Sequence, residues 1–216
     1  MIRALRHWLR RPAGHRYERK LKLPNKPSDV AKRALDIFVS AIALLVLAIP
    51  MLLLAAAVRA TSPGPAIHWS KRVGRYNRLF LMPKFRTMRI DTPQVATHLM
   101  TDPDRWLTPI GGFLRRSSLD ELPQLVSVLV GDMSLVGPRP ALFNQDDLIA
   151  LRKQKDVDAL RPGLTGWAQV NGRDELAIAE KVRLDEEYLN RRSLMFDLKV
   201  MMMTLAKVAG RQGVSF

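Results

Sequence analysis

The pattern of apolar and polar positions divides the chain at one long uncharged run. Residues 37 to 58 carry no charged side chain over 22 positions. As a helix this run would extend about 33 Å, enough to cross the hydrocarbon core of a bilayer. Pro50 interrupts the run, and a proline inside a helix removes a backbone hydrogen bond and clashes with the preceding turn. We therefore expect a membrane-associated helix that bends near its middle.

The charges around this run bear on its topology. Eleven Lys or Arg precede it, many more follow, and there is no acid between Asp36 and Asp91. A spanning helix would place one basic flank outside, against the positive-inside tendency. A re-entrant helix hairpin, which enters and leaves by the same face, avoids that conflict; a single span and a buried helix of a soluble protein are the alternatives. A cleaved signal peptide is disfavoured because the basic leader is too long.

The first 27 residues are rich in Lys and Arg and carry Ile2, Leu5, Trp8 and Leu9 at helical spacing. This pattern is typical of an amphipathic helix lying in the membrane interface. A disordered basic tail is the alternative, because the periodic part is short and two prolines follow soon after it.

After the turn signal at 61–65, the patterns predict a small globular part. Residues 79 to 90 read as a strand whose period of two would place Lys84 and Arg86 on one face. The remaining expected elements are a loop at 91–110 with a short helix around 95–100 as an alternative, a helix from Asp120 to Val130 with Pro123 in its first turn, tight turns at 161–167 and 171–172, and helices at 175–190 and 194–208.

These elements predict an α+β fold that is mainly helical, in a monotopic membrane protein. We divide it into a basic interfacial segment at 1–30, a re-entrant hairpin at 31–60 and a cytoplasmic catalytic domain at 61–216 that ends in an amphipathic helix.

Composition narrows the chemistry. Thirty-five Lys and Arg against twenty Asp and Glu give a net charge of +15, which implies a polyanionic partner such as anionic lipid, nucleic acid or a phosphorylated small molecule. There is no Cys, which excludes disulfides, thiolate metal sites and Cys nucleophiles. The four His are isolated, so carboxylates remain the leading candidates for catalysis.

The candidate chemistry lies at Asp120 and Glu121, followed by Arg139 between Pro138 and Pro140. An acid that attacks a phosphoryl group meets charge repulsion, on the order of 4 kcal/mol per charge pair at 4 Å in a medium of dielectric 20. Cations must offset it, so the pattern implies Mg²⁺ beside Asp120 and arginines that hold phosphates. Candidate substrate-binding residues are Arg139, Arg115, Lys84, Arg86, Gln124, Pro138 and Pro140.

Other interpretations remain open for the same residues. Ser118 and Glu121 match a capping box, Asp120 suits a helix N-terminus, and Arg139 could satisfy loop carbonyls. Lys84 and Arg86 fit a solvated strand face equally well. At the level of the whole chain, a non-catalytic scaffold and a membrane-tethered nucleic-acid binder compete with an enzyme, although no nucleic acid is expected because no binding motif is present.

The chain resembles the bacterial sugar transferase family, the monotopic phosphoglycosyl transferases, from about Ala31 to Ser215. The matching motifs, in order, are Lys32-Arg33-Ala34-Leu35-Asp36, Ser62-Pro63-Gly64-Pro65, Lys71-Arg72-Val73-Gly74, Lys84-Phe85-Arg86-Thr87-Met88, the acid pair, Gly137-Pro138-Arg139-Pro140 and the run from Arg161 to Arg173.

The resemblance implies that Asp120 attacks the β-phosphorus of a UDP-sugar, releases UMP and carries the phosphosugar until polyprenyl phosphate, such as undecaprenyl phosphate, takes it. Glu121 would assist the acceptor, Arg139 would bind a phosphate, and Arg115 would support the site. These steps would begin exopolysaccharide, O-antigen, capsule or glycoprotein glycan assembly.

The resemblance also implies a re-entrant hairpin broken at Pro50, on the cytoplasmic face of a bacterial inner membrane with anionic lipids. Ile49 stands where many members have Ser. The chain looks like the minimal form of the family. The sugar, the pathway and the oligomeric state, with a homodimer as one candidate, stay open.

Overall fold

The structure is a computed structural model that describes residues 28–92, 103–172 and 176–210. The expected interfacial helix before residue 28 and the alternative helix around 95–100 lie outside the described residues.

The described chain is mainly helical, with two small sheets, as the sequence predicts. Its elements are α2 (Ser28–Thr61), β1 (Ile67–Val73), η1 (Arg75–Asn77), β2 (Leu79–Phe85), η3 (Pro103–Trp106), α3 (Gly111–Arg116), η4 (Leu119–Glu121), α4 (Gln124–Val130), β3 (Ser134–Val136), α5 (Asp146–Gln154), η5 (Val157–Ala159), β4 (Gly163–Thr165), α6 (Trp167–Val170), α7 (Ile178–Arg191) and α8 (Leu194–Ala209).

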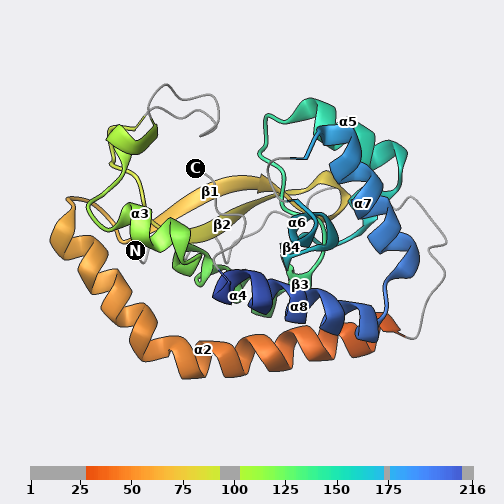
Figure 1. The fold of residues 1–216 in the computed structure, drawn as a ribbon, viewed down its shortest axis with the longest axis horizontal. Coiled ribbons are helices and arrows are strands. Elements are labelled where there is room, and N and C mark those ends of the chain that lie inside the picture. Colours follow the sequence, from red (N-terminus) through yellow and green to blue (C-terminus); the bar gives the residue numbers. More distant parts are fainter. Residues whose placement is uncertain (1–27, 93–102, 173–175, 211–216) are drawn as a thin grey trace.

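Helix α2 is the longest element, with 34 residues. It contains the uncharged run and continues through Pro50, and Figure 1 shows that it bends near its middle. The bend agrees with the cost of a proline inside a helix. By length and composition α2 could cross a membrane. Whether it enters and leaves by one face depends on where the bilayer lies, so the hairpin stays a prediction.

Two strand pairs lie above α2 (Figure 1). β1 and β2 form an antiparallel hairpin in which His68 pairs with Lys84. The expected strand at 79–90 is shorter than predicted, since β2 ends at Phe85. β3 and β4 pair in parallel, and β4 occupies the segment 163–165 that we expected to be turn only.

The main core lies where α2, α4, α7 and α8 meet β3. Val128, Val136, Tyr188 and Val200 are almost fully buried there, and Val39 of α2 packs against them. A second cluster joins the far half of α2 to the acid-bearing turn: Val58, Phe85 and Leu114 are buried, and Leu119 and Leu122 pack on them. Helix α2 therefore rests on the globular part along most of its length.

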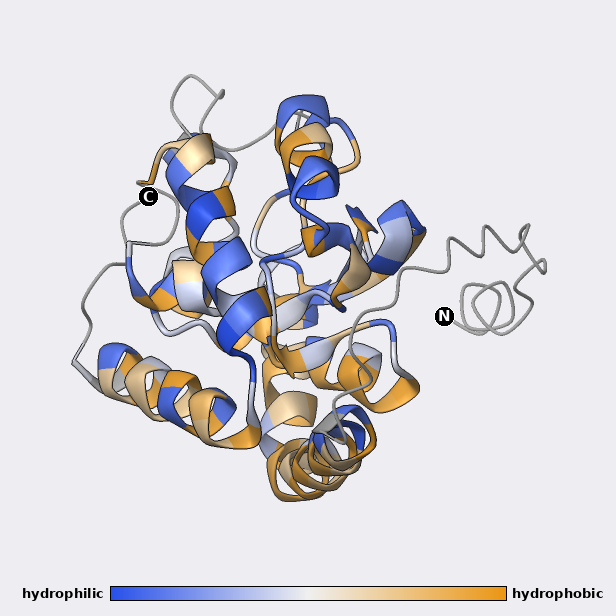
Figure 2. Cartoon of the chain, turned by 90° about the vertical axis from the view of Figure 1, so that its right-hand side faces the viewer, coloured by the Kyte–Doolittle hydropathy of each residue, from blue (hydrophilic) through white to orange (hydrophobic). Residues whose placement is uncertain are grey.

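The outward side of α2 and α8 is apolar and exposed. Hydrophobic residues dominate α2 at the bottom of Figure 2, where its outward side faces solvent in the isolated chain. The exposed large apolar residues of these helices include Leu45, Val46, Ile49, Leu52 and Leu53 on α2 and Met195, Met202 and Leu205 on α8. A continuous apolar surface on this scale marks a membrane or protein contact. This surface makes α2 compatible with membrane association.

Candidate active site

The acid pair lies in a turn before a helix rather than inside one. We expected the helix to begin near Asp120, but α4 begins at Gln124, and Asp120 and Glu121 belong to the 3₁₀ turn η4. Pro123 directly precedes α4, where its missing N–H costs nothing. Ser118 has a left-handed backbone (φ 57°), and its side chain makes no cap hydrogen bond. The capping box is therefore not formed.

Glu121 instead holds two cations. Lys84 Nζ donates to Glu121 Oε1 over 2.7 Å, and Arg139 Nη1 lies 3.5 Å from the same oxygen. Lys84 also lies 3.9 Å from Asp120 Oδ2. The strand β2 and the loop after β3 thus meet at the acid pair and bring positive charge to it.

Asp120 is the more buried acid, with 8% of its surface exposed. The pKa of Asp120 is raised to about 6, mainly by burial and also by the charge of Glu121, against the lowering effect of Lys84, Arg115 and Arg139. An acid whose pKa is shifted by burial and specific charged neighbours is a functional-site candidate. At neutral pH most of Asp120 is still ionised, so a nucleophilic carboxylate is present.

The other predicted arginines differ in position. Arg115 Nε donates to Thr87 Oγ1 over 3.1 Å, and its charge acts on Asp120. Arg86 is 5% exposed and donates to the carbonyl oxygens of Ser62 and Pro63, so it ties the end of β2 to the turn after α2. The structure thus brings Arg115 to the acid pair and turns Arg86 toward backbone carbonyls.

Gln124 directly follows the acid-bearing turn. It is 2% exposed, and its side-chain nitrogen finds no hydrogen-bond partner among the described residues. A buried amide donor without a partner costs free energy, and no described residue offsets that cost here.

The loop that carries Arg139 is held through its carbonyls. Gly163 N donates to the oxygen of Pro138 over 2.9 Å, and Arg72 Nη1 donates to that of Pro140 over 3.3 Å. The two prolines themselves offer no N–H. A Cβ at Gly163 would collide with the backbone of Gly137, so only glycine permits this close approach.

Sequence reasoning missed three residues around this loop and the acid pair. Thr87 accepts from Arg115. Arg152 of α5 donates to the carbonyl oxygen of Arg139 over 2.8 Å, and Asp185 of α7 holds Arg152. Arg152 and Asp185 stand 33 positions apart, and no local pattern signals their pairing.

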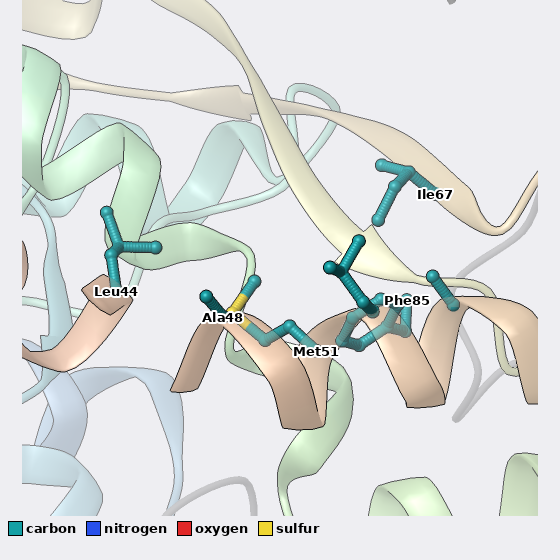
Figure 3. Close-up of a pocket in the computed structure, with 7 residues that line it drawn as sticks. Leu44, Ala48, Met51, Ile67 and Phe85 are labelled. Atoms are coloured by element: carbon teal, nitrogen blue, oxygen red, sulfur yellow. The ribbon is translucent and has the colours of Figure 1, made fainter. Parts of the chain in front are cut away.

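An apolar recess lies beside the site, between α2 and the hairpin of β1 and β2. Its volume is about 380 Å³, and its lining comes from α2, β1 and β2 (Figure 3). The lining residues are Leu44, Ala48, Met51, Leu52, Ala55, Ile67 and Phe85. Phe85 is the neighbour of Lys84, and it belongs to the same cluster as Leu119 and Leu122, which flank the acids. The recess therefore adjoins the acid-bearing turn.

The described residues contain no group of three or more His, Asp or Glu side chains that could bind a metal by themselves. Mg²⁺ in phosphoryl-transfer sites is often held by one or two carboxylates together with substrate phosphates. Asp120 and Glu121 supply that donor chemistry, although Glu121 is engaged by Lys84. The carboxylates present therefore have the chemistry to hold a magnesium ion together with a phosphate ligand.

Comparison with known proteins identifies the family of this chain. The family model described as bacterial sugar transferase matches residues 27–211. A UDP-glucose:undecaprenyl-phosphate glucose-1-phosphate transferase of Xanthomonas campestris is 40% identical over 191 residues, which are 85% of this chain and 40% of that protein. A protein of the same name from Caulobacter vibrioides is 42% identical over 193 residues, covering 85% of this chain and 71% of its own length.

An undecaprenyl-phosphate galactose phosphotransferase of Salmonella typhimurium is 36% identical over 209 residues, which are 88% of this chain and 43% of that protein. The chain thus spans less than half the length of two of these three relatives. Since the family model matches residues 27–211, a range that contains all of the described residues, the chain belongs to the bacterial sugar transferase family.

Proposed function

We propose that this protein transfers a sugar 1-phosphate from a UDP-sugar to polyprenyl phosphate through a phosphosugar bound to Asp120. The observation that carries the proposal is a buried carboxylate with Lys84 and Arg139 grouped around its neighbour Glu121. The names of relatives from Xanthomonas and Salmonella point to the same substrate classes.

In the first half-reaction, a carboxylate oxygen of Asp120 attacks the β-phosphorus of the donor. A bond forms between this oxygen and phosphorus, the bond to the α-phosphate oxygen breaks, and UMP leaves with the electron pair. Lys84, Arg115 and Arg139 offset the repulsion between the acid and the diphosphate. Asp120 would also hold a Mg²⁺ ion, which would supply further neutralisation of phosphate charge.

In the second half-reaction, an oxygen of the acceptor phosphate attacks the same phosphorus. The aspartyl bond breaks, the carboxylate is restored, and a polyprenyl diphosphate sugar forms. Glu121 keeps Lys84 beside the reacting phosphorus and assists the incoming acceptor. The acceptor phosphate is already mostly ionised at neutral pH, because the second pKa of a phosphomonoester is near 6.

The isoprenoid end of the acceptor lies in the apolar recess of α2. The recess is lined only by apolar side chains and adjoins Leu119 and Leu122, which flank the acids. An apolar lining suits an isoprenoid chain that comes from the equally apolar interior of the bilayer. The same position brings the phosphate end to the acid pair.

The membrane would cover the outward faces of α2 and α8, with the bend at Pro50 pointing into the lipid. Both ends of α2 contact the globular part: Arg33 donates to the carbonyl oxygens of Val128 and Leu129, and Val58 packs in one cluster with Phe85 and Leu114. A helix that crossed the bilayer would separate its ends by the whole membrane. The contacts support a re-entrant arrangement, and we propose that both ends lie on the cytoplasmic face.

Release of UMP tests the proposed function. Purified protein in detergent with Mg²⁺ and undecaprenyl phosphate would be offered UDP-glucose and UDP-galactose, the sugars that the relatives' names give. We expect UMP with at least one UDP-sugar and none with Asp120→Asn. UMP release by the Asn variant at the wild-type rate would overturn the aspartyl mechanism.

A further inference from the structure

The position of the Arg139 side chain depends on a loop with few hydrogen bonds of its own. Pro138 and Pro140 donate none, so the loop is held mainly by donors that reach its carbonyl oxygens from other elements. β4 supplies the donor for Pro138, and β1 supplies the donor for Pro140. The central carbonyl, that of Arg139 itself, is reached from α5 by Arg152.

Arg152 is held in turn by a buried carboxylate. Its Nε and Nη2 atoms donate to Asp185 Oδ2 over 2.9 and 2.7 Å, and its third nitrogen, Nη1, donates to Arg139 O over 2.8 Å. Asp185 is 1% exposed and Arg152 is 9% exposed. A planar guanidinium can donate to the carboxylate and to the carbonyl at the same time, whereas the single ammonium group of lysine cannot reproduce this arrangement of donors.

The buried ion pair of Arg152 and Asp185 is an energetically unfavourable way to make a purely structural contact. Removing two charges from water is rarely repaid by their attraction, and apolar residues of similar volume often stabilise a protein at least as well. Burial raises the pKa of Asp185, against the opposing effect of Arg152. A neutral pair of side chains could join α5 to α7, but it would not supply the third donor to the Arg139 carbonyl.

We propose that Arg152 is a positioning residue for Arg139 and that Asp185 orients it. The chain of contacts runs from Asp185 on α7 through Arg152 on α5 to the backbone of Arg139, whose guanidinium lies 3.5 Å from Glu121. Helix α7 thereby fixes where a phosphate-binding cation stands, although neither Arg152 nor Asp185 is expected to touch substrate. The inference rests on the proposed function, in which Arg139 binds a substrate phosphate.

Fixing the backbone of Arg139 matters because its side chain is long and its side-chain surface is 39% exposed. A mobile arginine loses rotamer entropy when it binds a phosphate, and that loss weakens binding. A displacement of about 1 Å at a reacting group can cost a factor of about 100 in rate.

The test replaces the pair without leaving a buried charge. The double variant Arg152→Met/Asp185→Leu keeps apolar volume between α5 and α7, so we expect the wild-type thermal midpoint or a higher one. We expect kcat/KM for UMP release to fall about 10- to 100-fold. Arg152→Lys keeps the charge but not the planar set of N–H donors. Its kcat/KM should therefore lie between the values of the double variant and of wild type.

The decisive comparison repeats these changes in an Arg139→Ala background. If Arg152 acts through Arg139, the double variant should then lower kcat/KM by less than about threefold further, because coupled residues are not additive. An equal fall in both backgrounds would overturn the proposal. So would a stable double variant with wild-type kinetics.

A matched control comes from a second ion pair between the same two segments. Lys155 and Glu186 lie 3.3 Å apart on the surface. Lys155→Met/Glu186→Gln should leave kcat/KM unchanged. A comparable loss in this control would mean that any disturbance between α5 and α7 affects the site, which contradicts a specific role for Arg152.

A readout without turnover separates this inference from the proposed function. Hydrogen exchange of the segment 137–142 should be faster in the Arg152→Met/Asp185→Leu variant than in wild type, with no change in the control. Unchanged exchange would overturn the positioning role even if the enzyme works. If exchange is faster in the double variant but the wild-type protein never releases UMP, the anchoring of the loop by Arg152 is supported and the proposed function is rejected.

Discussion

At the scale of single residues, the acid pair shows two different environments for neighbouring carboxylates. Asp120 is nearly buried with a raised pKa, whereas Glu121 is engaged directly by Lys84. Because their environments differ, the two acids are suited to different roles. Asp120 is suited to attack phosphorus, and Glu121 is suited to hold cations near it.

Replacing Asp120, the proposed nucleophile, should remove activity without harming the fold. Asp120→Asn keeps the volume of the side chain, so we expect turnover to fall by about 10³-fold or more while the thermal midpoint stays equal or rises. UMP release and thermal unfolding measure the two effects. An Asn variant that retains a tenth of the activity would exclude covalent catalysis by Asp120.

The raised pKa makes a prediction about stability and pH. The folded pKa of Asp120 is about 6 and the unfolded value is near 4, so between these values the folded state binds more protons. Stability from this group is present below about pH 4 and is lost as the pH rises through 6, on the order of 3 kcal/mol.

Thermal midpoints of metal-free wild type and Asp120→Asn should therefore diverge between pH 4 and 7, with Asn the more stable at the upper end. Parallel curves across this window would show that burial does not perturb the carboxyl group.

At the scale of elements, the sequence predicts well where a single periodic pattern decides the structure. The helix expected at 194–208 is observed at Leu194–Ala209, with Ser193 accepting a hydrogen bond at its start. The long helix with Pro50 is likewise observed. In both cases the local pattern and the packing favour the same structure.

The predictions from sequence were wrong or incomplete where contacts between distant segments determine the structure. The start of α4 was misplaced because Pro123 suits both the first turn of a helix and the position just before it. The parallel pair of β3 and β4 spans three residues in each strand and depends on a partner far along the chain. For the site, the acids and Arg139 could be read from the sequence, but Arg152 and Asp185 could not.

The recess of α2 leads to a prediction about the acceptor. Ala48 lines the recess, so Ala48→Phe would fill part of it and should raise the KM for undecaprenyl phosphate several-fold. UMP release in the first turnover, which needs only the donor, should be unaffected. Ala56→Phe is the matched control, because Ala56 is an exposed residue of α2 outside the lining. Equal KM values for both variants would place the isoprenoid chain elsewhere.

At the scale of the whole molecule, the two ends of α2 should lie on one side of the membrane. The chain has no Cys, so single cysteines report position without background labelling. We expect Ala31→Cys and Ala60→Cys, both exposed, to react with an impermeant maleimide from the cytoplasmic side. Ile49→Cys, beside Pro50, should be protected by lipid. Labelling of the two ends from opposite sides would show a single span.

The proposed mechanism depends on a covalent bond between Asp120 and a phosphosugar, and mass spectrometry detects this bond directly. Protein incubated with UDP-sugar and Mg²⁺ but no acceptor, then quenched in acid, should gain the mass of one phosphosugar on the peptide that contains Asp120. Addition of undecaprenyl phosphate before the quench should remove it, and Asp120→Asn should never acquire it. Rapid UMP release by wild type with no adduct, or an adduct on another residue, would contradict the account.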